Sequence, residues 1–348
     1  MVDYIVVGFG LAGLSFVDKL ESNDKSYLVY ENSSEQSSRV AGGLYNPVIL
    51  KRFTLAWLAS EQLELAISVY QNIEDKLKGS LISKLPILRR FNDVKEQNLW
   101  FEAYDKPLLN KFLSSNLIKN ENEALDIPFC FGKVKHTGKI DVKKMLSLYL
   151  SYIEDKKCLI KESFEYDKLV VKEGLVEYKG IKARNLVFSE GYGVRNNPFF
   201  NYLPLQGNKG EYIIIKSEQL KLSEAVKSSI FIIPLGDDLY KVGATYNNQD
   251  KTSGITKSAR ENLQNKLERF LKVEYEVIDQ VTGIRPTTRD RRPFVGTHSQ
   301  YKNLHIINGL GSRGILIGPY VTEKLYAHIE NGEDLDEEID IKRYSKLR

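Results

Sequence analysis

The sequence predicts a mixed fold, α/β plus α+β, in which a domain built on an antiparallel sheet is inserted into a domain of alternating strands and helices. A strand, a glycine-rich turn and a helix follow one another near both ends of the chain, as VVGFGLAGL at 6–14 and NGLGSRGILIGP at 308–319. Between them, β-rich runs at 210–216, 229–235 and 239–246 have the spacing of an antiparallel sheet. A length of 348 residues suits two domains.

The first part of the chain should open with a strand at Tyr4–Val7, which leads through the glycine turn into a helix. A second strand is expected at 26–31, and the polar stretch at 32–43 is typical of a loop. Apolar residues at helical spacing then predict one long amphipathic helix from Phe53 to about Leu77.

Later elements follow the same reasoning from periodicity and turn residues. They are a helix at 136–153 with Asp141 as its N-cap, a hairpin at 169–180, a strand at 185–191, a helix at 257–271, a strand at 303–309 and a helix from Gly314 to about His328. We expect one discontinuous domain to comprise residues 1–50, 136–195 and 280–348, and the inserted domain to comprise 51–135 and 196–279.

Composition places the chain among ordinary globular proteins, because 42% of its residues are hydrophobic and 28% are charged. The net charge of +4 neither requires nor excludes a nucleic-acid partner. No apolar run is long enough to cross a bilayer and no signal segment opens the chain, so we expect a cytoplasmic protein. Cys130 and Cys158 form no metal-binding pattern, so we expect buried thiols and no metal site.

The first glycine turn has the G-x-G-x-x-G spacing, formed by Gly8, Gly10 and Gly13 directly after a strand and before a helix. The first glycine permits a tight turn, the second permits close approach of a pyrophosphate, and the third lets the helix pack on the strand. Glu31, at the end of the next strand, is placed to accept hydrogen bonds from a ribose. The sequence therefore predicts a Rossmann-like dinucleotide-binding domain.

The dinucleotide could be NAD or FAD on this motif alone. NAD binding favours βαβ units that continue through the first 150 residues or so, whereas the alternation here stops after Glu31. FAD-binding folds tolerate that interruption, and the late glycine turn can supply backbone around a flavin ring.

An ordered series of motifs resembles the D-amino acid oxidase superfamily of FAD-dependent oxidoreductases along almost the whole chain. Besides the first glycine turn, the series comprises SSRVAGGLYNP at 37–47, HTGKID at 136–141, VFSEG at 187–191, VGATY at 242–246, GIRPTTRDRRPFVG at 283–296 and GLGSRGILIGP at 309–319. Within that superfamily the chain resembles the glycine oxidases and, in its GATY, TRDRRPFVG and GLGSRG segments, the FAD domain of bifunctional enzymes that make 5-methylaminomethyl-2-thiouridine in tRNA.

The resemblance implies non-covalent FAD, since no cysteine occurs near 285–320. The residues it assigns to the cofactor are Gly8, Gly10, Leu11, Ala12, Gly13, Glu31, Asn32, Ser38, Arg39, Ala41, Gly42, Gly43, Ser189, Glu190, Gly191, Gly311, Ser312, Arg313, Gly314 and Ile315. It also implies that backbone N–H groups of Gly311 to Gly314, with the following helix dipole, stabilise an anionic reduced flavin.

Substrates of such enzymes carry a carboxylate, for which a guanidinium gives two parallel hydrogen bonds. Arg285 matches the family position of this clamp; the alternative is a structural ion pair with Asp290. Arg313 is a second candidate, which could instead bond the flavin or its own loop. Phe231 stands where a tyrosine hydroxyl would assist the carboxylate in glycine oxidases, so Tyr246 or Tyr45 is the candidate replacement.

The activity implied is oxidation of the C–N bond of a glycine-type amine by hydride transfer to flavin N5, followed by hydrolysis of the imine. The amine could be a free small molecule or part of tRNA, with Lys51, Arg52, Arg89 and Arg90 as candidate phosphate contacts. A non-catalytic FAD-containing binding protein is the alternative of another class. The electron acceptor and oligomeric state stay open, and Lys209 is a candidate for oxygen activation.

Overall fold

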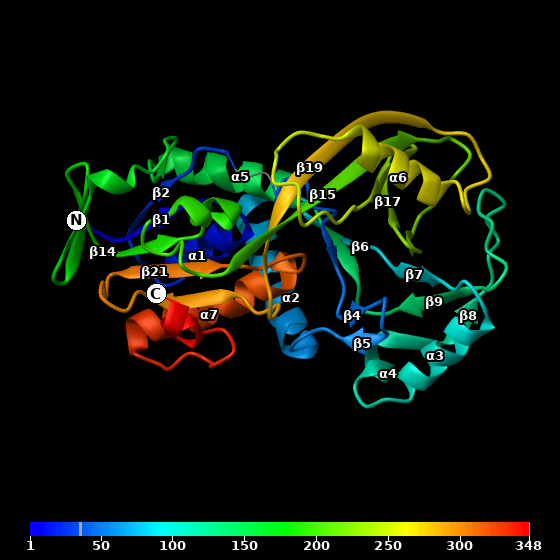
Figure 1. Cartoon of the computed structure of the whole chain (residues 1–348), viewed down its shortest axis with the longest axis horizontal. Helices are drawn as coiled ribbons and strands as arrows, with labels where there is room; N and C mark the ends of the chain where they lie inside the picture. The colour runs from blue at the N-terminus through cyan, green and yellow to red at the C-terminus, as the bar shows by residue number, and fades with distance from the viewer. Residues whose placement is uncertain (35–36, 348) are drawn as a thin grey trace.

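The computed structural model describes residues 1–34 and 37–347, and two large sheets dominate it (Figure 1). The strands of the first sheet are β1 (Val2–Val7), β2 (Tyr27–Tyr30), β11 (Leu159–Ile160), β12 (Leu169–Lys172), β13 (Leu175–Tyr178), β14 (Ile181–Phe188), β20 (Phe294–Thr297) and β21 (Leu304–Asn308). Strands β11, β2, β1, β14 and β21 lie side by side in parallel. Strand β20 pairs antiparallel with β21, and the β12–β13 hairpin pairs antiparallel with the start of β14.

Strand β1 lies inside this sheet and is buried on both faces. Tyr4 and Val6 belong to the core that faces the helices, while Ile5 and Val7 belong to the core on the opposite face. A parallel strand covered on both sides needs this continuous apolar run, which explains the sequence DYIVV.

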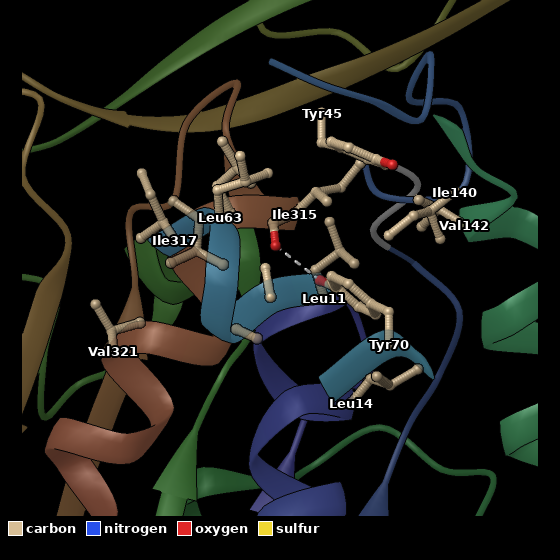
Figure 2. Close-up of a cluster of buried hydrophobic side chains, with 14 of the residues drawn as sticks. Leu11, Leu14, Tyr45, Leu63, Tyr70, Ile140, Val142, Ile315, Ile317 and Val321 are labelled. Carbon is tan, nitrogen blue, oxygen red and sulfur yellow. Dashed lines mark hydrogen bonds between the residues drawn. The ribbon is translucent and has the colours of Figure 1, made fainter. Parts of the chain in front are cut away.

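Helices α1 (Leu11–Glu21), α2 (Ala59–Leu77), α5 (Val142–Asp155) and α7 (Gly314–Asn331) pack together against the first sheet. Asp141 caps α5 as predicted, because its side chain accepts a hydrogen bond from the Lys144 N–H. The residues before this cap are not helical as predicted, because Gly138–Ile140 forms strand β10. Figure 2 shows the contact of α2 with the start of α7, where the Tyr70 hydroxyl donates to the Ile315 carbonyl at 3.0 Å. Helix α2 thereby supports the segment that carries the second glycine turn.

The predicted helix from Phe53 was wrong in its first six residues. Thr54–Leu55 forms strand β5, paired with β4 (Val48–Ile49), and α2 begins only at Ala59. Phe53 and Leu58 have φ of 49° and 44°, in the left-handed region that a right-handed helix cannot include. Apolar spacing alone does not reveal such backbone reversals.

The second sheet lies in the right half of Figure 1. Its strands are β7 (Ile87–Arg90), β8 (Leu113–Ile118), β9 (Phe131–Val134), β15 (Leu205–Lys216), β16 (Ala225–Lys227), β17 (Phe231–Gly236), β18 (Leu239–Gly243) and β19 (Glu276–Thr288). The order is β19-β15-β18-β17-β16-β7-β9-β8, and β16–β7 is the only parallel pair among the described strands of this second sheet. The three predicted antiparallel strands are confirmed as β15, β17 and β18.

Strand β15 separates two environments. Ile213 and Ile215 point into a second apolar core that includes Leu263 and Leu267 of α6 (Lys257–Leu267). Because side chains alternate along a strand, Tyr212 lies on the opposite face. The sheet therefore presents one face to its own core and the other to the first half of the molecule.

A small antiparallel sheet is formed by β3 (Leu44–Tyr45), β6 (Ile82–Lys84) and β10 (Gly138–Ile140). Helices α3 (Val94–Tyr104) and α4 (Leu109–Phe112) pack beside β8 of the second sheet (Figure 1). Helix α2 packs on α7 and strand β19 spans the boundary predicted at residue 280, so each lies across the proposed division into domains. Cys130 and Cys158 are free thiols and half-buried, not fully buried as expected. No described helix could span a membrane, and no metal-binding cluster occurs in the described residues.

Buried His305 makes the stability of the fold depend on pH. Burial and nearby His328 lower its pKa to about 3, so it stays neutral in the folded protein while the unfolded chain takes up a proton near pH 6.5. The free energy of unfolding that depends on neutral His305 is fully present above pH 6.5. It falls by about 1.4 kcal/mol per pH unit as the pH drops from 6.5 toward 3. We expect His305→Gln to reduce the slope of unfolding free energy against pH by that amount, measured by urea unfolding at pH 7, 6 and 5. Equal slopes for both proteins would contradict this prediction.

Candidate active site

A cavity of about 480 Å³ lies where the carboxyl ends of β1, β2 and β14 meet the inner face of the second sheet. This volume is in the range usual for cofactor and small-molecule sites, and the end of a parallel sheet is where such folds bind nucleotides. Both glycine turns contribute to its wall, as does Tyr212 from β15.

The first glycine turn is a cradle that side chains would fill. Gly8 has φ of +92°, and a Cβ atom there would lie 2.7 Å from the Ser189 carbonyl oxygen. A Cβ on Gly13 would lie 2.1 Å from the Gly8 carbonyl oxygen, so helix α1 can pack on β1 only through a glycine. Gly10 faces Ser38, whose Oγ would lie 3.1 Å from an added Cβ.

Hydrogen bonds from three separate segments hold this turn. The Phe9 N–H donates to the Glu31 carboxylate at 2.5 Å, and the Leu11 N–H donates to Ser38 Oγ at 3.2 Å. The Ser189 hydroxyl donates to the Gly8 carbonyl at 2.7 Å. The acidic residue and the two serines that sequence reasoning selected therefore meet at the first glycine turn.

The cavity wall contains most residues proposed for the cofactor. They are Gly8, Gly10, Leu11, Ala12, Glu31, Asn32, Ser38, Ala41, Gly42, Gly43, Ser189, Glu190, Gly191, Gly311, Ser312, Arg313, Gly314 and Ile315. Gly13 lies behind the turn and acts through packing, and Arg39 does not contribute to the wall.

The second glycine turn offers fewer backbone donors than expected. The Gly311 N–H donates to the Pro286 carbonyl at 2.9 Å, and the Arg313 N–H donates to the Leu310 carbonyl at 3.3 Å. Within the described part of the chain, the N–H groups of Ser312 and Gly314 have no recorded acceptor. The 18-residue helix α7 begins there, so its positive end faces the cavity. The expectation for four donors is thus corrected to two.

Arg285 projects from β19 into the cavity with its charge unpaired by any described carboxylate. Its Nη1 donates to the Asn208 side-chain oxygen at 2.9 Å and to the Thr245 carbonyl at 3.3 Å. Burial raises the pKa of the Tyr212 hydroxyl overall, and the Arg285 guanidinium beside it opposes this rise. The guanidinium lies against Gly210, where an added Cβ would be 2.1 Å from Nη2. Because no carboxylate of the described residues pairs with this guanidinium, a carboxylate that enters the cavity could approach it.

The alternative ion pair with Asp290 is wrong, because Asp290 instead pairs with Arg343 Nε at 3.0 Å and bonds the Tyr344 hydroxyl. Arg343 and the Arg292 backbone N–H also lower the pKa of the Asp290 carboxyl against the effect of burial. Asp290 therefore pairs with the C-terminal segment, and it is not a partner of Arg285.

Arg313 lines the cavity but its guanidinium bonds the loop between β3 and β4. Its Nη1 donates to the Asn46 carbonyl at 2.7 Å and its Nη2 to the Val48 carbonyl at 3.4 Å. Burial and nearby Arg291 lower its pKa. These contacts favour the interpretation that Arg313 fixes its surroundings.

The candidate hydroxyls differ in position. Tyr246 is 72% exposed and its ring stacks beside the Arg285 guanidinium, 4.6 Å from Cζ to ring centroid. Tyr45 is buried, with its hydroxyl directed at Gly138. Lys209, the oxygen-activation candidate, is buried away from the cavity wall and pairs with Asp250 at 2.6 Å.

Sequence reasoning missed Tyr212 and Lys241. Tyr212 lines the cavity from β15. Lys241 of β18 donates to the Val40 and Ala41 carbonyls at 2.9 and 3.1 Å, and burial lowers its pKa to about 8. It fixes the loop that carries Gly42. Strand periodicity predicts on which face of the sheet each side chain lies. No local sequence signal shows that this face of the sheet lies against residues 40–43.

The glycine cradle, the Glu31 carboxylate and the free N-terminus of α7 fit a dinucleotide, and comparison with known proteins identifies which one. Residues 3–326 match the family model described as FAD dependent oxidoreductase. The chain belongs to this FAD-dependent oxidoreductase family. It is an FAD-dependent oxidoreductase.

Two curated relatives of this oxidoreductase are tRNA 5-methylaminomethyl-2-thiouridine biosynthesis bifunctional proteins. That of Shewanella halifaxensis is 26% identical over 181 residues, which cover 41% of this chain and 28% of the relative. That of Shewanella pealeana is 25% identical over 181 residues, with the same coverage of 41% and 28%. The chain thus matches little more than a quarter of their length.

Among solved structures, the oxidoreductase resembles glycine oxidase from Bacillus cereus, with a TM-score of 0.78, 18% identity and coverage of 96% of both chains. Iminodiacetate oxidase from Chelativorans sp. BNC1 aligns with a TM-score of 0.79 and 17% identity, over 98% of both chains. L-proline dehydrogenase from P. horikoshii aligns with a TM-score of 0.77 and 14% identity, over 99% of this chain and 98% of the other. At these identities the likeness confirms the fold.

Proposed function

We propose that this oxidoreductase oxidises the C–N bond of a glycine-type amine, such as glycine or sarcosine. The observation that supports this most directly is the unpaired Arg285 guanidinium in a cavity that also contains the glycine cradle. Arg285 is half-buried, and a partly desolvated cation without a carboxylate partner favours an anionic ligand. Arg285 is thus proposed to hold the substrate carboxylate, with the amine directed toward the rest of the cavity.

FAD, when bound, would supply the acceptor for the hydride released from the amine carbon. The first glycine turn, Glu31 and Ser38 are proposed to hold its nucleotide portion, and the start of α7 to face the ring. Neither cysteine nor any of the four histidines lines the cavity in the described residues, which favours non-covalent binding. A cytoplasmic location stays a prediction from the sequence.

The test is anaerobic titration of the FAD-loaded protein with glycine and, separately, with sarcosine, followed by the flavin absorbance. We expect loss of the oxidised flavin band with at least one of these amines, and glyoxylate after hydrolysis of the imine. A spectrum unchanged by both would contradict a small glycine-type substrate. Admission of air afterwards would show whether oxygen restores the oxidised band.

A second candidate is oxidation of a carboxymethylaminomethyl group on tRNA wobble uridine, favoured by the curated relatives. Lys51 and Arg52 are exposed and available for phosphate contacts. Arg89 is not, because it is buried and pairs with Glu96 at 2.9 Å. Bleaching of the flavin by tRNA that carries this group, with no response to glycine or sarcosine, would establish this candidate over the first.

A further inference from the structure

Asn208 contacts the Arg285 guanidinium from the neighbouring strand. The two residues pair directly in the antiparallel β15–β19 ladder, so their side chains share one face of the sheet. Asn208 Oδ1 accepts a hydrogen bond from Arg285 Nη1 at 2.9 Å. Gly210 on the same face of β15 leaves room for the guanidinium, because an added Cβ there would lie 2.1 Å from Nη2. Asn208 is buried and does not line the cavity, so it would act on a ligand through Arg285.

One orientation suits the side-chain amide of Asn208. A guanidinium has donors and no acceptor, so the amide must present its oxygen to Arg285 and its NH2 group to the other side. That NH2 group donates to Asn248 Oδ1, in the loop that follows β18. The same loop supplies the Thr245 carbonyl, which also accepts from Arg285 Nη1, at 3.3 Å. The amide thus lies between the guanidinium and a loop oxygen, and it fixes the direction of Nη1.

The contacts recorded for the Arg285 guanidinium in the described part of the chain are with neutral groups. Besides Asn208 and the Thr245 carbonyl, they are the Tyr212 hydroxyl and the Tyr246 ring. Neutral acceptors offset part of the desolvation cost of a half-buried cation but leave its net charge uncompensated. An aspartate in place of Asn208 would instead give the guanidinium a carboxylate partner within the protein.

The acidic side chains close to this point of the sheet bond on its opposite face. Lys209 is buried, and its Nζ pairs with Asp250 at 2.6 Å. Glu211 is also buried, and its carboxylate accepts a hydrogen bond from the Gln280 amide at 2.8 Å. Because side chains alternate along a strand, Lys209 and Glu211 point away from the face that carries Asn208. These carboxylates are therefore used on the far face, and the guanidinium keeps its neutral neighbours.

We propose that Asn208 is a positioning residue of this oxidoreductase. Its neutral amide fixes the direction of the Arg285 guanidinium and leaves the positive charge available to an anionic ligand. The inference rests on the proposed role of Arg285 in holding the substrate carboxylate. It adds a physical reason why an amide, and not a carboxylate, lies beside that arginine.

The test is Asn208→Asp in the FAD-loaded enzyme, which replaces the NH2 group by an oxygen of similar size and adds one negative charge. Asn248 is exposed and can turn its own amide toward the new oxygen, so we expect the variant to fold. The dissociation constants of acetate, an anion, and of acetamide, its neutral counterpart, are measured by calorimetry and by the change in flavin absorbance. Because the new carboxylate pairs with the guanidinium and repels acetate, we expect the acetate constant to rise by about tenfold or more, with acetamide binding and FAD content unchanged.

Asn247→Asp is the matched control, because it adds the same charge to the exposed loop that follows β18. Its carboxylate can still accept from the Gln249 and Asp250 N–H groups, as the amide oxygen does at 2.8 and 3.0 Å. Since exposed charges are screened by solvent, we expect its acetate constant to stay within about twofold of the unaltered enzyme.

A second variant, Asn208→Ala, removes the acceptor without adding a charge. The guanidinium then loses one hydrogen bond that fixes its direction but keeps its uncompensated charge. We therefore expect the acetate constant to rise by about threefold to tenfold, which is less than for Asn208→Asp.

An acetate constant unchanged by Asn208→Asp would overturn the role of Asn208, as would an equal rise for acetamide or an equal rise in Asn247→Asp. If Asn208→Asp does not fold, an acetate constant unchanged by Asn208→Ala would overturn it instead. Failure of the unaltered enzyme to bind acetate would do the same.

These binding measurements are independent of turnover. If acetate affinity depends on Asn208 while no glycine-type amine bleaches the flavin, the proposed reaction fails and the positioning role stands. Bleaching by glycine, together with unchanged acetate binding in Asn208→Asp, would give the opposite result.

Discussion

Arg285→Ala should retain FAD but lose most of its activity on amines that carry a carboxylate. Removing one partner of a buried charge pair costs about 2–5 kcal/mol. We therefore expect kcat/KM for the active glycine-type amine to fall by about 30-fold to about 5,000-fold. The measurement is the rate of anaerobic flavin reduction across substrate concentrations, together with the absorbance ratio that reports FAD content.

Two further variants make this result specific. Arg285→Lys keeps the charge but loses the planar fork, so it should recover only part of the activity. Arg289→Ala removes an exposed arginine just beyond the same strand, outside the cavity wall, and should behave as the unaltered enzyme. Loss of FAD from Arg285→Ala with unchanged affinity for the amine would show that the guanidinium serves the cofactor instead.

The parts of the site that sequence analysis predicted are those with local signatures. The G-x-G-x-x-G turn needs only its flanking strand and helix to be recognisable, and Gly8 and Gly13 are glycines for the backbone reasons the motif implies. Asp141 was likewise predictable as a helix cap, because capping is decided within four residues.

What the sequence did not predict depends on contacts between distant segments. Tyr212 acquires its place because β15 pairs with β19, with Tyr212 opposite Val281, and because this face of β15 lies toward the loop at 40–43. The Gly311 N–H is used by Pro286, and the assumption of a free donor there failed for that reason. Arg89, expected at the surface, is buried because Glu96 and the Leu50 carbonyl receive its guanidinium. Composition and periodicity do not predict these contacts between residues far apart in the sequence.

The start of α2 shows a different limit. Its apolar stripe continues smoothly into Phe53 and Trp57, yet the left-handed backbone at Phe53 and Leu58 separates a small hairpin from the helix. Arg313 donates to the Asn46 carbonyl, which lies just before this hairpin, and to the carbonyl of Val48, its first residue. A helix beginning at Phe53 would remove β5, which pairs with Val48 and Ile49, so the reversal that periodicity missed supports the segment that Arg313 bonds.

Gly13→Ala should weaken FAD binding by altering the turn from behind. The added Cβ would lie 2.1 Å from the Gly8 carbonyl oxygen and 2.8 Å from Ser189 Oγ. The serine can rotate, but the carbonyl belongs to the turn itself, so relief of the clash must displace backbone at Gly8. Overpacking of this kind costs about 1–3 kcal/mol, which corresponds to about a 5-fold to 150-fold rise in the FAD dissociation constant if the turn takes the strain.

The measurement is the FAD dissociation constant of the apoprotein on reconstitution with FAD. The unfolding temperatures of the apoprotein and of the FAD-loaded protein are measured in parallel. Gly254→Ala is the matched control, because its added methyl would meet no atom within 4 Å and should leave both quantities unchanged. If Gly13→Ala lowers the unfolding temperature of the apoprotein while FAD affinity stays the same, the glycine serves packing of α1 on β1 alone. If Gly13→Ala instead reduces the free energy of FAD binding more than it reduces the stability of the apoprotein, the strain lies in the glycine turn. We expect this outcome because the added Cβ would meet the Gly8 carbonyl oxygen, which belongs to that turn.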